Sequence, residues 1–117
     1  MNKMKVEKFL DSRVALLQKN LEAFPEKFSE NPAWALEWSE ATFKEAAELA
    51  VLLDIKNDFK KLLENPENSM EKYIEHLKDT IVRKAQWVFH STSPISNLLE
   101  EYKKVAMARF VDMVESF

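Results

Sequence analysis

Glycine is absent from this chain of 117 residues, although average usage would supply about eight glycines. Favoured hairpin turns need residues that adopt positive φ, and phosphate-binding loops need glycine so that the backbone can approach the ligand closely. The absence therefore disfavours tight β-meanders and glycine-rich nucleotide-binding loops.

Cysteine is absent as well, which excludes disulfides, thiolate metal ligands and thiol nucleophiles. No run of about 18 uncharged apolar residues occurs, so the sequence predicts no membrane-spanning helix. The basic opening segment, residues 1–13, carries Glu7 and Asp11 where a secretion signal needs an apolar run. We therefore expect a cytoplasmic protein that does not bind membranes.

Charge of neither sign accumulates, because 17 basic and 20 acidic residues are interleaved and give a net charge of −3. Without a dense basic patch, duplex DNA or RNA is not an expected partner. Hydrophobic residues make up 46% of the chain and charged residues 32%, which is a globular composition. At this length we expect a single domain that spans residues 1–117.

Apolar residues recur three and four positions apart along most of the chain, the spacing of one helix face. The first such pattern predicts a helix over residues 3–24 that ends at Pro25, because proline does not fit a helix interior. Asn31 followed by Pro32 is typical of an N-cap and a first helical residue, so a second helix is expected to begin there.

The second helical pattern continues to about residue 64 and is apolar on two opposite faces, which predicts a central helix. A single helix of that length is far above the average, so we expect a break near residues 56–58. The pattern therefore allows either four or five helices in the whole chain.

Two further helices are predicted, over residues 69–90 and 94–117. Asn68 and Glu71 have the spacing of a capping box, and Ser93 precedes Pro94 as a cap. The core face of the last helix is expected to carry Ile95, Leu98, Leu99, Tyr102, Ala106, Phe110, Met113 and Phe117. With short connections, the prediction is an all-α, compact bundle of four or five helices that are mostly antiparallel neighbours.

Three charged residues fall on apolar helix faces. Arg13 lies among the apolar residues of the first helix, and Glu45 and Glu48 lie on or beside an apolar stripe of the second. Because an unpaired buried charge is costly, these residues predict a structural ion pair between the two helices. Trp34 and Trp38, four residues apart, are expected to line the core or a groove, with a partner-binding face as the alternative.

Carboxylates on the second helix allow a catalytic alternative. The segments EWSE (37–40) and EAAE (45–48) resemble the Glu-x-x-Glu half of the magnesium site in MazG-type nucleotide pyrophosphohydrolases. That resemblance implies a metal-dependent hydrolase on Glu37, Glu40, Glu45 and Glu48. The second half of that motif, Glu-x-x-Asp, does not occur, and neither histidine has the Glu-x-x-His spacing of a di-metal bundle. We therefore predict no metal site and no cofactor.

The segment RKAQWVFH, residues 83–90, resembles the Arg-x4-6-His motif of HEPN-family ribonucleases, which are small helical bundles that cleave RNA at a dimer interface. The resemblance covers eight residues and implies that Arg83 and His90 are catalytic. The family often has Asn, Asp or His after the arginine, where this chain has Lys84. Asp79, four residues before Arg83, also offers the arginine a local ion pair, so we expect no catalytic pair here.

The leading functional hypothesis is a non-enzymatic interaction protein, either an accessory or regulatory subunit or a self-associating module that forms a homodimer or a larger oligomer. Its expected surface combines a polar and aromatic stripe on the third helix with apolar residues that lie off the core face of the last helix. These residues are Tyr73, His76, Arg83, Trp87, Met107, Val111 and Val114. The HEPN-like ribonuclease is the alternative function, and the metal-dependent hydrolase is the third.

Overall fold

The structure, a computed structural model, describes residues 3–64, 70–86 and 94–116. Within these ranges the chain forms five helices and no strand, so the all-α prediction is confirmed. The helices are α1 (Lys3–Glu30), α2 (Pro32–Glu37), α3 (Ser39–Glu64), α4 (Met70–Gln86) and α5 (Pro94–Glu115). The molecule is elongated, with extents of 51, 33 and 23 Å along its principal axes.

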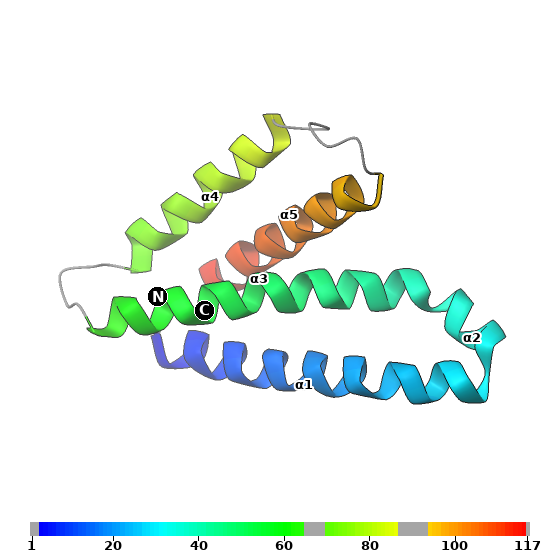
Figure 1. Cartoon of the computed structure of the whole chain (residues 1–117). Helices are drawn as coiled ribbons and strands as arrows, with labels where there is room; N and C mark the ends of the chain where they lie inside the picture. Colours follow the sequence, from blue (N-terminus) through cyan, green and yellow to red (C-terminus); the bar gives the residue numbers. More distant parts are fainter. Residues whose placement is uncertain (1–2, 65–69, 87–93, 117) are drawn as a thin grey trace.

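The helix α3 is the central element of the bundle. It packs against α1 on one side and against α5 on another, while α4 packs on α5. Figure 1 shows α1 and α3 lying side by side, with the short helix α2 joining them at one end of the molecule. The two apolar faces of the second helical pattern correctly predicted this central position.

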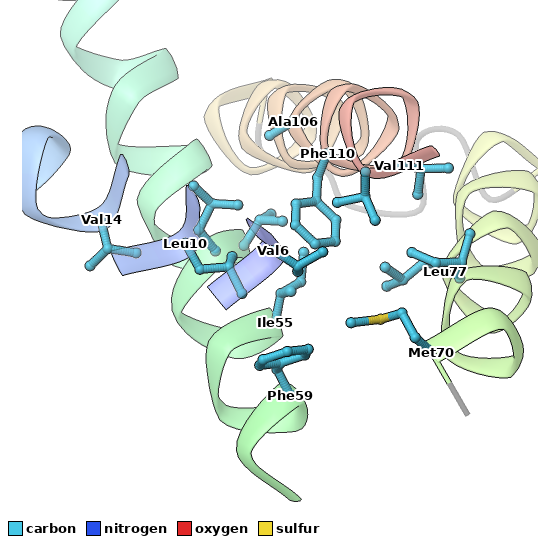
Figure 2. Packing of buried hydrophobic residues seen from close by; sticks show 14 of the residues in the cluster. Val6, Leu10, Val14, Ile55, Phe59, Met70, Leu77, Ala106, Phe110 and Val111 are labelled. Atoms are coloured by element: carbon cyan, nitrogen blue, oxygen red, sulfur yellow. The ribbon is translucent and has the colours of Figure 1, made fainter. Parts of the chain in front are cut away.

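The core is formed by side chains from α1, α3, α4 and α5. In Figure 2 the ring of Phe110 points from α5 toward Val6 of α1 and Ile55 of α3, and Met70 and Leu77 approach from α4. Each of these five side chains is at most 5% exposed. Burial of such a side chain stabilises the fold by roughly 1.5–3 kcal/mol, so this cluster supplies the main driving force for packing the helices together.

The N-terminus of α2 forms as the sequence predicts. The Asn31 side chain accepts a hydrogen bond of 3.1 Å from the backbone N–H of Trp34, and Pro32 is the first helical residue. Helix α5 likewise begins at Pro94. The caps predicted for α4 and α5, Asn68 and Ser93, lie outside the described residues.

The prediction that Pro25 ends the first helix was wrong, because α1 continues through Pro25 to Glu30. A proline in a helix interior removes one backbone hydrogen bond and costs about 3 kcal/mol. The extra turns bring the rings of Phe24 and Phe28 to a centroid distance of 6.3 Å. The Ser29 hydroxyl also donates a hydrogen bond of 3.2 Å to the Pro25 carbonyl. These contacts offset part of the cost of the proline.

The predicted break near residues 56–58 was also wrong, since α3 is continuous there and the chain bends instead at Trp38. Ile55 and Phe59, on either side of residues 56–58, are both buried, and only a continuous helix places both on the core face. Lys56 forms an ion pair of 3.0 Å with Asp11 of α1, which also fixes this part of α3 against its neighbour.

No helix in the described part of the chain combines the length and the apolar character needed to cross a membrane.

The position of Pro25 inside α1 leads to a stability prediction. Pro25→Ala is expected to raise the free energy of unfolding by about 2 kcal/mol. Alanine restores a helix hydrogen bond, and this gain outweighs the larger conformational entropy that the unfolded chain has without the proline. Urea denaturation followed by circular dichroism measures this change. Pro32→Ala is the matched control and is expected to change stability by less than about 1 kcal/mol, because proline fits the first helical position. Equal stabilities of wild type and Pro25→Ala would contradict the continuous helix.

Candidate functional site

An ion pair between Arg13 of α1 and Glu48 of α3 lies at the side of the core. The guanidinium donates two hydrogen bonds, from Nε to Oε1 at 2.7 Å and from Nη2 to Oε2 at 2.8 Å. The side chains are 36% and 21% exposed, so the pair is half-buried. Of the two carboxylates that the sequence offers, Glu48 forms the pair, and Glu45 contributes its charge nearby.

The environment of Arg13 keeps its guanidinium charged. The hydrogen bonds to Glu48 raise the pKa of Arg13, partial burial lowers it, and the negative charges of Glu48 and Glu45 raise it further. The fork-to-fork geometry is the strongest form of arginine–carboxylate contact. Glu48 is therefore held as a neutralised partner of Arg13 and is not free to act as a base or a metal ligand.

The core-facing stripe of α3 changes character along the helix. Residues spaced three and four apart on this stripe are Ala41, Glu45, Glu48, Leu52, Ile55 and Phe59. Leu52, Ile55 and Phe59 are buried under α1 and α5, whereas Ala41, Glu45 and Glu48 are only partly covered. On this stripe, the first half of α3 therefore lacks the large apolar side chains that close the core in the second half.

Two adjoining cavities open over the polar half of this stripe. One has a volume of about 300 Å3 and the other about 320 Å3. Both are lined by Arg13, Glu48, Ala106 and Arg109, so they lie next to each other between α1, α3 and α5. We refer to the two adjoining cavities as the interhelical groove.

One end of the interhelical groove is held by contacts around Tyr102 of α5. Its hydroxyl donates a hydrogen bond of 3.2 Å to Glu40, and its ring packs edge-on against Phe43 at 5.6 Å. Lys44 lies 5.3 Å from the centre of the same ring and forms an ion pair of 3.4 Å with Glu40. These contacts join α3 and α5 and fix the width of the groove at this end.

The α5 side of the interhelical groove carries exposed apolar side chains. Val105 and Met113 are each 40% exposed, and Arg109 lies between them at a spacing of four residues. Arg109 is exposed and forms no hydrogen bond or ion pair with any residue in the described ranges. The sequence assigned Met113 and Leu98 to the core face, which was wrong, because both are at least 40% exposed.

The expected exposure of Val111 and Val114 was wrong too. Val111 is 4% exposed and Val114 is fully buried, while Met107 is partly buried and packs against the core. Helix α4 packs on this side of α5, and Lys78 of α4 forms an ion pair with Glu115 of α5. The true core face of α5 is therefore turned toward α4, and these three residues do not form an exposed apolar surface.

Three of the other four predicted surface residues lie on α4. Tyr73 is partly buried and donates a hydrogen bond of 3.0 Å to Asp58 of α3, and burial followed by the charge of Asp58 raises the pKa of Tyr73. His76 is exposed. Arg83 forms an ion pair of 2.9 Å with Asp79, and Trp87 lies outside the described residues. Tyr73 therefore connects two helices of this chain.

His90 also lies outside the described residues, so the structure does not place the two candidate ribonuclease residues relative to each other. Arg83 is 71% exposed and already paired with Asp79. We expect wild type and an Arg83→Ala/His90→Ala variant to give the same RNA degradation when each is incubated with a mixed RNA pool and examined on denaturing gels. Cleavage that is present in the wild type and lost in the double variant would contradict this expectation.

The four carboxylates of the alternative metal site do not converge. Glu48 is paired with Arg13, and Glu40 accepts a hydrogen bond from Tyr102 and contacts Lys44. Glu37 belongs to the separate helix α2. Among the residues that the structure describes, no group of three or more histidine, aspartate or glutamate side chains has the arrangement of a metal site.

The expected burial of the two tryptophans was wrong for Trp38, which is 51% exposed, while Trp34 is half-buried. Helix α2 packs mainly on α1 and lies at the end of the molecule, where Leu36 stays 69% exposed. The resulting aromatic tip consists of Phe24, Phe28, Trp34, Leu36 and Trp38. Lys27 lies 5.0 Å from the centre of the Trp34 ring. The sequence did not predict this cluster, because a helix that ends at Pro25 does not bring Phe28 beside Phe24.

Comparisons of the chain with known protein families, with curated proteins and with solved structures found no match.

The contribution of the Arg13–Glu48 pair can be measured directly. Arg13→Ala is expected to lower the free energy of unfolding by about 2 kcal/mol, because it leaves a half-buried carboxylate unpaired while solvent screens part of the effect. Arg83→Ala is the matched control, since it removes an exposed pair and is expected to cost at most about 0.5 kcal/mol. Urea denaturation compares the two. Equal losses for both variants would contradict a special role for the pair at the groove.

Proposed function

We propose that this protein is a non-enzymatic interaction protein, an accessory or regulatory subunit that binds another protein in the interhelical groove. The observation that carries the proposal is the pair of adjoining cavities, with the exposed side chains of Val105 and Met113 on their α5 side. Partly exposed apolar side chains in a concave site are what a binding partner covers.

Four of the six charged side chains that line the groove are paired, which favours binding over catalysis. Arg13 and Glu48 are bound to each other, and Lys44 is paired with Glu40. A catalytic acid or base needs a polar group that is free to exchange a proton with the substrate. Charged side chains that are already paired instead fix the shape of the groove and the spacing of its walls.

The groove would surround a partner more completely than the aromatic tip, the other exposed apolar surface. The aromatic tip lies at the end of the molecule, on the last turns of α1 and on the short helix α2 with its C-cap Trp38. The groove receives side chains from three helices, so a partner bound there would be covered on several sides. Surfaces that bury a partner's side chains on several sides usually contribute most of the binding energy.

The proposal predicts that a charge on the groove wall abolishes partner binding. Tagged wild-type protein and the Val105→Asp variant are used to capture partners from the native host, and the captured proteins are quantified by mass spectrometry. Val82→Asp is the matched control, because Val82 is also an exposed valine, 55% exposed, but lies on α4 away from the groove. We expect one or more partners to be retained by wild type and Val82→Asp and lost with Val105→Asp. Identical sets of captured proteins for all three would contradict binding in the groove.

A further inference from the structure

We propose that the occupant of the interhelical groove is one amphipathic helix of a partner protein, about three turns long, that places a carboxylate opposite Arg109. This inference rests on the proposed function and identifies the chemical class of the partner. The observations behind it are the length of the groove, the small residues that line it and Arg109, for which the described residues supply no ion pair.

The length of the groove fits a short helix. Its lining residues on α5 run from Glu101 to Met113, which corresponds to about 18 Å at the rise of 1.5 Å per residue of an α-helix. A guest of about twelve residues, or roughly three turns, spans this distance. A guest helix in the groove would contact α1, α3 and α5, the three helices that line it.

Small side chains allow a helix to approach closely. Ala41 of α3 and Ala106 of α5 line the same cavity from opposite helices. Packed helices lie about 8–10 Å apart depending on the side chains at their contact, and alanines allow the shorter distances. The exposed side chains of Val105 and Met113, eight residues apart on α5, are placed to contact apolar residues spaced three and four apart on the guest.

The groove offers a partner a positive charge at Arg109, while Glu45 lies near Arg13 and acts on its charge. The Arg13 charge is neutralised by Glu48, and Glu101 forms an ion pair of 2.9 Å with Lys104. Arg109 is exposed in both cavities and has no partner among residues 3–64, 70–86 and 94–116. Closing the groove over an unpaired guanidinium would be costly, so a fitting guest supplies a carboxylate for it.

A second copy of the chain fits less well. The exposed large apolar side chains that the structure describes on the other helices are Met4, Leu16, Phe28, Leu36, Leu53 and Val82. No two of them share a helix at a spacing of three or four residues, so none of these helices shows a three-turn apolar stripe. On α5, exposed apolar residues recur about every two turns, at Leu98, Val105 and Met113, but this helix itself forms a wall of the groove.

The test uses a display library of random peptides of about 16 residues, long enough for about four helical turns. The library is selected for binding to the purified full chain. We expect the enriched peptides to share apolar residues three and four apart, to lack internal proline and to carry a common aspartate or glutamate. The dissociation constant of one enriched peptide is then measured by fluorescence anisotropy against variants of the protein.

Arg109→Glu is expected to weaken peptide binding at least tenfold, and exchanging the peptide carboxylate for lysine is expected to restore it. Arg83→Glu is the matched control, an exposed arginine on α4, and is expected to leave the affinity unchanged. Circular dichroism of each variant shows that the bundle is intact.

Three results would overturn the helix proposal: no enriched peptide, enriched peptides without helical spacing, or equal effects of the two arginine variants. If host partners are nevertheless lost with Val105→Asp, the proposed function stands and only the class of occupant is wrong. A dimer in sedimentation that is lost with Val105→Asp and kept with Val82→Asp would assign the groove to a second copy and overturn the partner helix.

Discussion

The bidentate contact between Arg13 and Glu48 is the constraint on which the arrangement around the groove depends. It joins α1 to α3 at the point where the core-facing stripe of α3 changes from apolar to polar. Separating the two side chains would leave each half-buried charge without its counter-charge. This cost holds the two helices in register at this position. The polar half of the stripe can therefore remain partly open without loosening the contact between α1 and α3.

The groove forms because this stripe of α3 changes from large apolar side chains to small and polar ones. Where α3 presents Leu52, Ile55 and Phe59, the side chains of α1 and α5 close over it, and the rings of Phe9 and Phe110 stack at 6.3 Å. Where α3 presents Ala41 and Glu45, too little side-chain volume is available to fill the space between its neighbours. The bundle is thus closed by hydrophobic packing at one end and held by polar contacts at the other.

The helix α5 contributes one face to the core and a neighbouring face to the proposed binding site. Its buried face, with Phe110, Val111 and Val114, is covered by α3 and α4. The neighbouring strip with Val105 and Met113 stays partly exposed along the groove. A guest helix on that strip would bury apolar area without disturbing the core, which suits a protein that is stable alone and binds a partner through a preformed site.

Local sequence patterns determined the helical class, the starts of α2 and α5 at proline, the central place of α3 and the charges that would need partners on α1 and α3. These features depend on interactions within a few residues, such as the Asn31 cap, or on the cost of an unpaired charge at an apolar position. Tertiary packing decided the rest. Contacts at the end of the bundle offset the cost of Pro25, burial of both Ile55 and Phe59 kept α3 continuous, and the docking of α4 turned Val111 and Val114 inward. The groove lies between three separate helices, so the periodicity of apolar residues within one helix could not predict it. The direction in which each apolar face points depends on which neighbouring helices cover it.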